Sequence, residues 1–140
     1  MSWTFYNASG QKLAAIGYLT ATQAEMETAT STATYVTPGR TQYHPGVAKV
    51  WCHITAAGGL SAPDHGVATV GDTGAGDRDV NFTTAFSGVT YIAVSSLSGG
   101  AAGSVANSRT SSADVTLLAF NASGSALDED HDTIIMGDLS

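Results

Sequence analysis

From Val47 onward, apolar and polar residues alternate in short runs, which is the pattern of β-strands with one buried face. Stretches rich in Gly, Ser and Asp separate the runs. Many short strands divided by glycine-rich turns are typical of a β-sandwich or jelly roll. The pattern therefore predicts an all-β, antiparallel sandwich or jelly-roll-like domain over residues 46–140. The expected strands are residues 47–56, 65–71, 79–86, 90–97, 114–121 and 132–139.

Two stretches between these strands are expected to be turns or loops. Residues 71–79 (GDTGAGDRD) have the composition of a hairpin tip. Residues 97–108 (LSGGAAGSVANS) have almost no side-chain mass. We expect this second stretch to be either a mobile loop or a segment packed closely against another chain.

The first 45 residues have a different pattern. Alternation around a central Asn-Ala-Ser-Gly turn predicts a hairpin over residues 2–19. A short helix is expected within residues 20–30, because Thr20 or Thr22 can cap it and two glutamates follow in its first turns. Two Pro-Gly pairs, at residues 38–39 and 45–46, then predict a stiff connector. We interpret residues 1–45 as an assembly or attachment segment.

The composition favours binding over chemistry. Only 12% of the residues are charged, against roughly a quarter in an ordinary domain. A surface so poor in charge can pack against copies of itself, so we expect oligomerisation. The net charge is −7, and the five Lys and Arg residues are scattered, so no nucleic-acid partner is expected. Neither a signal peptide nor a membrane-spanning segment is expected, and we expect no membrane insertion.

The lone cysteine and the four histidines do not suggest a metal or redox site. Cys52 lies in an apolar run and is expected to be a buried, inert thiol. His53 follows it directly, so in a strand the two side chains would point to opposite faces. The histidines lack the spacing of zinc ligands; they are His44, His53, His65 and His131. We expect no cofactor and no catalytic residue.

One motif indicates an enzyme. Asp-Thr-Gly-Ala at Asp72–Ala75 also occurs in dimeric aspartic proteases of the retroviral type, where two aspartates share a proton. Gly71 stands where that family has an apolar residue, and the IIMG sequence lies close to the last residue of the chain. A hairpin tip explains the same residues, so the Asp72 protease is a remote alternative.

Two acidic turns are candidate calcium sites. The first spans Asp72–Asp79 and the second Asp128–Asp132. Neither has the ligand spacing of an EF-hand. An exposed acidic turn is the simpler interpretation of each.

Four stretches together resemble bacteriophage tail-fibre and related virion surface proteins. They are FYNASGQKLA, TATQAEMETATSTATYVTPGRTQYHPGVAKVW, GDTGAGDRDVNFTTAFSGVTYIAVSS and HDTIIMGD. The second is the most specific, because it combines a short Ala/Thr/Glu helix, a Thr-Pro-Gly-Arg turn and a Tyr-His-Pro-Gly-Val-Ala-Lys run into a strand with Trp.

The resemblance implies a homotrimeric, non-enzymatic β-module displayed on a virion after synthesis in the bacterial cytoplasm. Arg40 and Lys49 would then be structural cations that pair with acids of the same or a neighbouring chain. Little chain precedes the first hairpin, whereas tail fibres usually have a long shaft. We therefore expect a capsid decoration or cement protein, or a short head fibre, bound to the major capsid protein or another virion protein. The alternative is a tail-fibre tip that binds a host surface glycan or protein.

Overall fold

The chain divides into two compact units, residues 1–44 and residues 45–140. The computed structural model describes residues 9, 20–28, 34–100 and 102–140. The hairpin expected over residues 2–19 lies outside the described residues, apart from Ser9. Each unit is described by itself below.

The first unit contains the expected short helix, α1 (Gln23–Thr28). Of the two candidate caps, Thr22 performs the role. Its hydroxyl oxygen accepts a hydrogen bond from the Glu25 amide at 3.2 Å, and the Glu25 carboxylate accepts one from the Thr22 amide at 2.8 Å. This reciprocal pair is a capping box, which satisfies amide groups that the first helical turn leaves without partners. Met26 provides the buried side chain of the helix.

The Pro-Gly connector is partly helical, which the sequence analysis did not predict. Helix α2 (Pro38–Thr41) begins with proline, whose fixed φ suits a first helical position. Thr37 is extended, as the residue before a proline usually is. The Arg40 guanidinium lies over the Tyr43 ring, 5.8 Å from its centroid. Within the described part of the chain, Arg40 thus contacts an aromatic ring, and its pairing with an acid of a neighbouring chain stays a prediction.

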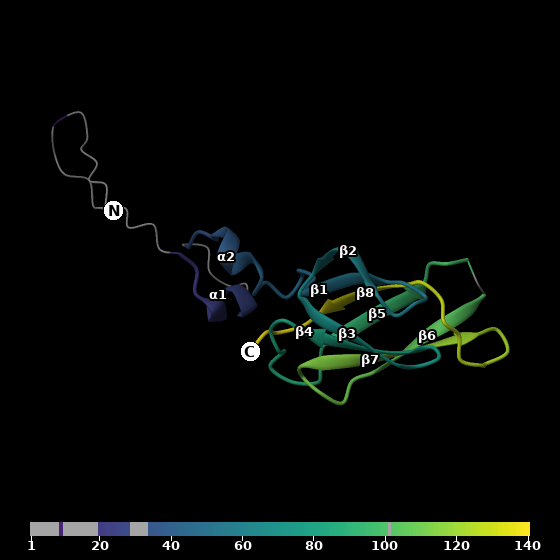
Figure 1. Ribbon diagram of the computed structural model, residues 1–140. Helices are drawn as coiled ribbons and strands as arrows, with labels where there is room; N and C mark the ends of the chain where they lie inside the picture. Colours follow the sequence, from purple (N-terminus) through teal and green to yellow (C-terminus); the bar gives the residue numbers. More distant parts are fainter. Residues whose placement is uncertain (1–8, 10–19, 29–33, 101) are drawn as a thin grey trace. The chain divides into compact units, whose positions relative to one another are not determined.

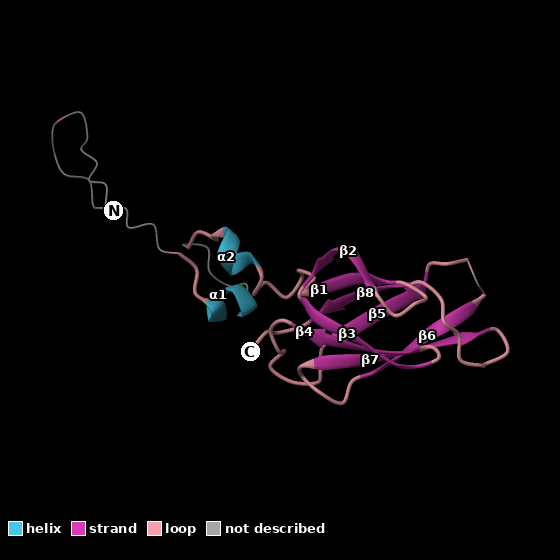
Figure 2. Cartoon of the chain, in the orientation of Figure 1, coloured by secondary structure: helices cyan, strands magenta, loops and turns pink. Residues whose placement is uncertain are grey.

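The second unit is a sandwich of two four-stranded antiparallel sheets (Figures 1 and 2). The first sheet has the order β2-β1-β8-β5 and the second β3-β4-β7-β6. The strands are β1 (Val50–Ile54), β2 (Leu60–His65), β3 (Val67–Gly74), β4 (Asp77–Phe82), β5 (Ile92–Leu97), β6 (Gly103–Ser108), β7 (Asp114–Asn121) and β8 (His131–Met136). The prediction of an all-β antiparallel sandwich is confirmed. Strands β1–β2, β3–β4 and β6–β7 form hairpins within single sheets, so a sandwich of hairpins describes the unit better than a jelly roll.

The core lies between the two sheets, and alternate residues of the central strands build it. In β1 and β8 every second residue is buried, and the same holds for β4 and most of β7. Three aromatic rings close one part of this core, with centroids 4.8 to 5.6 Å apart; they are Phe82, Phe86 and Tyr91. Lys49, which we expected to be a structural cation, is buried just before β1.

Strands β2 and β6 lie almost wholly outside the predicted strands, and β6 lies in a stretch that we predicted to be a loop. Strand β2 contains Pro63, which cannot donate a ladder hydrogen bond but is tolerated because β2 is an edge strand. Strand β6 occupies residues 103–108 of the low-mass stretch and pairs with β7. A Cβ at Gly103 would lie 2.0 Å from the Phe120 carbonyl oxygen. Gly103 thus lets β6 lie close to β7 of the same chain. The expectation of a loop was wrong for residues 103–108.

Candidate functional site

The most densely bonded polar group in the described sandwich is the guanidinium of Arg78. Arg78 belongs to β4, where Arg78, Val80 and Phe82 occupy successive inward-facing positions. The residue is only 2% exposed. An arginine at an inward-facing position must find acceptors for its N–H groups, because an unpaired buried charge is strongly unfavourable.

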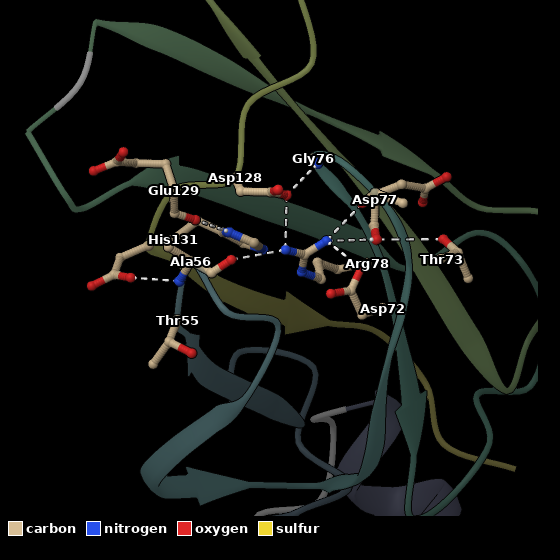
Figure 3. A network of polar contacts seen from close by, with 12 residues as sticks. Thr55, Ala56, Asp72, Thr73, Gly76, Asp77, Arg78, Asp128, Glu129 and His131 are labelled. Carbon is tan, nitrogen blue, oxygen red and sulfur yellow. Dashed lines mark hydrogen bonds and ion pairs between the residues drawn. The ribbon is translucent and has the colours of Figure 1, made fainter.

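The two terminal nitrogens of Arg78 make five hydrogen bonds. Nη1 donates to a carboxylate and two carbonyls, those of Asp72 (2.8 Å), Gly74 (2.8 Å) and Asp77 (3.0 Å). Nη2 donates to the carbonyl of Ala56 (3.0 Å) and the carboxylate of Asp128 (2.9 Å). Figure 3 shows Asp72, Asp77, Ala56 and Asp128 around the guanidinium. Arg78 therefore joins the β1–β2 turn, the β3–β4 turn and the β7–β8 connection.

The Asp128 carboxylate accepts a second hydrogen bond, from the backbone. The Gly76 amide in the β3–β4 turn donates to the same Asp128 oxygen at 2.7 Å. This backbone hydrogen bond, with the Arg78 hydrogen bond second, lowers the pKa of the Asp128 carboxyl below its ordinary value. The contact requires the chain at Gly76 to adopt a φ of +68°, which favours glycine.

Three buried polar atoms around this network lack a hydrogen-bond partner among the described residues. They are Asp77 Oδ1, Arg78 Nε and His131 Nε2. His131 Nδ1 lies 3.1 Å from the Glu129 carbonyl oxygen, so Nδ1 carries the proton and Nε2 is a bare acceptor. Burial lowers the pKa of His131, and the nearby Arg78 charge lowers it further. The imidazole is therefore neutral at neutral pH.

The structure places the candidate protease aspartate in this network. Asp72 lies on β3, directly opposite Arg78 on β4, and is ion-paired with it. In an aspartic protease the carboxylate shares a proton with a second carboxylate. Here the partner of Asp72 is the Arg78 guanidinium, 2.8 Å away, in place of a second carboxylate.

The two acidic turns that we considered as separate calcium sites meet at one guanidinium. Asp72 comes from the first turn and Asp128 from the second. Three further acids of these turns also have partners within the chain, since Asp79 accepts from Thr116, while Asp130 and Asp132 contact His53. In the part of the chain that the structure describes, no group of three or more His, Cys, Asp or Glu residues is placed to hold a metal ion.

Cys52 and His53 point to opposite faces of β1, as predicted. Cys52 is buried, and burial, with a smaller contribution from nearby carboxylates, raises its pKa to about 11. The thiol is therefore protonated and unreactive at neutral pH, in agreement with the prediction of an inert thiol. His53 lies between Asp130 (3.7 Å) and Asp132 (2.9 Å) on the outer side of the sheet.

The role of Arg78 was missed in the sequence analysis, although its signal is present. In DRDVNF the arginine shares the alternating phase of Val80 and Phe82, which places a charged residue on the buried face. Neither a family model, nor a curated protein, nor a solved structure matches the chain. Across the described residues, no helix has the length and apolar character needed to span a membrane.

Proposed function

We propose that this chain is a non-enzymatic structural protein of a bacteriophage virion, a small homotrimeric module displayed on the particle surface. The non-enzymatic part of this proposal is supported by the contacts that the acidic residues make within the chain. Asp72 and Asp128 both bind Arg78, and Asp130 and Asp132 both contact His53. These four carboxylates are therefore engaged in contacts within the chain.

The assignment to a virion is supported by the four stretches of sequence resemblance, which span most of the chain. The architecture agrees with a structural role, because one buried guanidinium is hydrogen-bonded to three separate segments of the sandwich. A module with few charged residues and a buried apolar core suits a protein that binds an assembled shell. Such binding stabilises the shell by mass action when the protein binds only the assembled form.

Within this class we favour a capsid decoration or cement protein or a short head fibre, bound to the major capsid protein or another virion protein. Purified particles should then contain the chain in a copy number tied to capsid symmetry. Particles that lack it should release their genome at a lower temperature than complete particles. Absence of the chain from purified particles would refute the proposal.

The receptor-binding alternative predicts a different result in the same system. Free protein added to host cells would compete with infection, whereas free decoration protein would leave infection unchanged. The remote protease alternative predicts peptide cleavage at pH 4–6 that Asp72→Asn abolishes. Absence of cleavage by the wild-type chain would exclude it.

A further inference from the structure

His131 is the first residue of β8, and its side chain faces the core. It has the same inward phase as Thr133 and Ile135, and only 2% of the residue is exposed. The inward-facing residues of the two strands that pair with β8 are uncharged; they are Val50, Cys52 and Ile54 of β1 and Ala93, Ser95 and Leu97 of β5. Burial of a charge without a partner is strongly unfavourable, so this position favours the neutral imidazole.

A cation faces the imidazole from the other sheet. Figure 3 shows the His131 ring directed toward the guanidinium of Arg78 on β4. Burial has the largest effect and lowers the pKa of His131, the hydrogen bond with the Glu129 carbonyl raises it, and the Arg78 charge lowers it further. His131 Nε2 has no hydrogen-bond partner among the described residues. A proton at Nε2 would therefore place a second buried positive charge beside Arg78, without an acceptor.

The carboxylates at this end of the described sandwich are engaged with other groups or point elsewhere. They are Asp72, Asp77, Asp128, Glu129, Asp130 and Asp132. Two of them are paired with Arg78, and two contact His53 on the outer side of the first sheet. None accepts a hydrogen bond from His131, because Nδ1 is bonded to a backbone carbonyl and Nε2 has no partner in the described chain. A protonated His131 thus lacks a neutralising partner.

Two other titratable groups lie on the neighbouring strand β1. The Cys52 thiol stays neutral, because burial and nearby carboxylates raise its pKa to about 11. His53 contacts Asp130 and Asp132, and a proton on its ring would strengthen both contacts. Protonation of His53 would therefore tighten this end of the sandwich, whereas protonation of His131 would loosen it.

The β7–β8 connection, residues 122–130, leads directly into His131 and is held by polar contacts. None of its residues is buried. Asp128 binds the Arg78 guanidinium at 2.9 Å, and the Asp130 carbonyl accepts a hydrogen bond from the Ser98 amide at 2.8 Å. Segments with few buried apolar contacts open at a lower free energy than the whole domain unfolds. The connection can therefore open while the strands keep their buried core.

We propose that His131 is an acid-sensitive switch: a proton on its imidazole releases the β7–β8 connection from Arg78 while the two sheets stay folded. When the connection lifts away, water reaches both side chains, which relieves the repulsion between the two cations and gives Nε2–H an acceptor. Release also frees the Asp128 carboxylate, which the closed form holds within the chain. The inference concerns the sandwich alone and does not depend on the proposed virion role.

The direction of the pH dependence follows from linkage. The imidazole binds a proton more readily when the connection is open, because it is hydrated there and its pKa approaches the ordinary value of about 6.5. The opening equilibrium should therefore increase as pH falls. The increase is up to about tenfold for each pH unit below about 6.5, until the pKa of the closed form is reached. At neutral pH the connection should be closed.

Amide hydrogen exchange of the full chain, followed by NMR, measures this opening. The reporters are the amides of Ser98 and Leu127, whose hydrogen bonds involve the connection. The internal controls are the amides of Phe82 and Phe86, which are bonded to residues 113 and 112 ahead of β7, at the opposite end of that strand. Protection factors are corrected for the intrinsic effect of pH on exchange. Between about pH 7 and about pH 5, those of the reporters should fall about tenfold or more, whereas those of the controls should stay constant.

Variants of His131 identify the sensor. His131→Phe cannot bind a proton and should abolish the fall at Ser98 and Leu127. His131→Asn is the second variant, because its uncharged amide can still donate to the Glu129 carbonyl; circular dichroism shows which variants fold. A folded variant that keeps the fall would overturn the inference, because another group would then be the sensor. Reporters that stay constant in the wild type would overturn it too, as would an equal fall at Phe82 and Phe86, which indicates global unfolding.

Discussion

Arg78 and Asp128, fifty residues apart in the chain, are joined by a 2.9 Å hydrogen-bonded ion pair that ties the β7–β8 connection to β4. The arginine is buried, whereas the aspartate side chain is half exposed. A long-range contact of this kind closes a large loop, and loop closure has an entropic cost that the contact must offset. The pair therefore links two segments that are distant in the sequence.

Replacement of Arg78 by Met should destabilise the sandwich strongly. Removal of one partner of a buried ion pair costs roughly 3–5 kcal/mol. The carboxylates that remain are about half exposed and can be hydrated, so we expect about 3 kcal/mol, near the lower end of that range. Arg78→Lys should also be destabilising, because one ammonium group cannot reach five acceptors in separate loops.

Urea unfolding followed by circular dichroism measures this loss. Arg40→Met is the matched control, because Arg40 is exposed and is placed on the Tyr43 ring. We expect the control to change the unfolding free energy by no more than about 0.5 kcal/mol. A similar small change for Arg78→Met would show that the network does not stabilise the fold.

Asp128 should make stability depend on acid pH. Its pKa is lowered in the folded chain, chiefly by the Gly76 amide and next by Arg78. A depressed carboxyl pKa gives stability that is fully present above the unfolded value of about 3.9 and is lost as pH falls through the folded value. The gap in unfolding free energy between wild type and Asp128→Asn should therefore be widest above about pH 5 and narrow below about pH 3.9. A gap that is constant with pH would contradict this account.

His131 should add a second pH dependence at a higher pH. Its pKa is lowered by burial, so the unfolded chain binds a proton more readily than the folded chain. The sign follows from linkage: stability is full above the unfolded value of about 6.5 and falls as pH decreases towards the folded value. In His131→Phe the urea midpoint of unfolding should change less with pH between about pH 6.5 and pH 5 than it does in the wild type. Glu129→Gln should retain the slope, because His131 is bonded to the Glu129 backbone carbonyl.

Much of the sandwich could be predicted from local pattern. Strand β7 matches its predicted range of residues 114–121, because alternation is clear there and turn residues flank it. Strands β2 and β6 could not be predicted in this way. Their Pro and Gly residues have weak strand propensity, and pairing with β1 and β7 overrides that propensity.

The site was predictable only in its parts. Asp72 and Asp128 were both selected from the sequence as acidic residues of interest. The pairing of β3 with β4 follows from the predicted hairpin tip, but the convergence of Asp72 and Asp128 also depends on the path of the β7–β8 connection, which no local pattern encodes. The available signal was a charged residue, Arg78, in the buried phase of β4; it lies within the first acidic turn, but only the acids of that turn were considered as site residues.

Gly76 and Gly124 provide a paired test of the turn that holds Asp128. Both adopt positive φ, +68° and +78°. A Cβ at Gly124 would meet nothing within 4 Å, whereas a Cβ at Gly76 would lie 2.5 Å from the Ala119 carbonyl oxygen and 2.8 Å from the Leu127 amide nitrogen. Gly124→Ala therefore incurs only the left-handed backbone cost of about 1–2 kcal/mol.

Gly76→Ala should cost more than Gly124→Ala in urea unfolding, because the β3–β4 turn must also move away from Ala119. That movement lengthens the hydrogen bond from the Gly76 amide to Asp128, so part of the acid-dependent stability should disappear as well. Gly124→Ala should keep the acid dependence of the wild type. Equal losses for the two variants would mean that close packing at Gly76 does not hold the turn in place. If both variants lost the acid dependence of stability, the hydrogen bond from Gly76 to Asp128 would not be its cause.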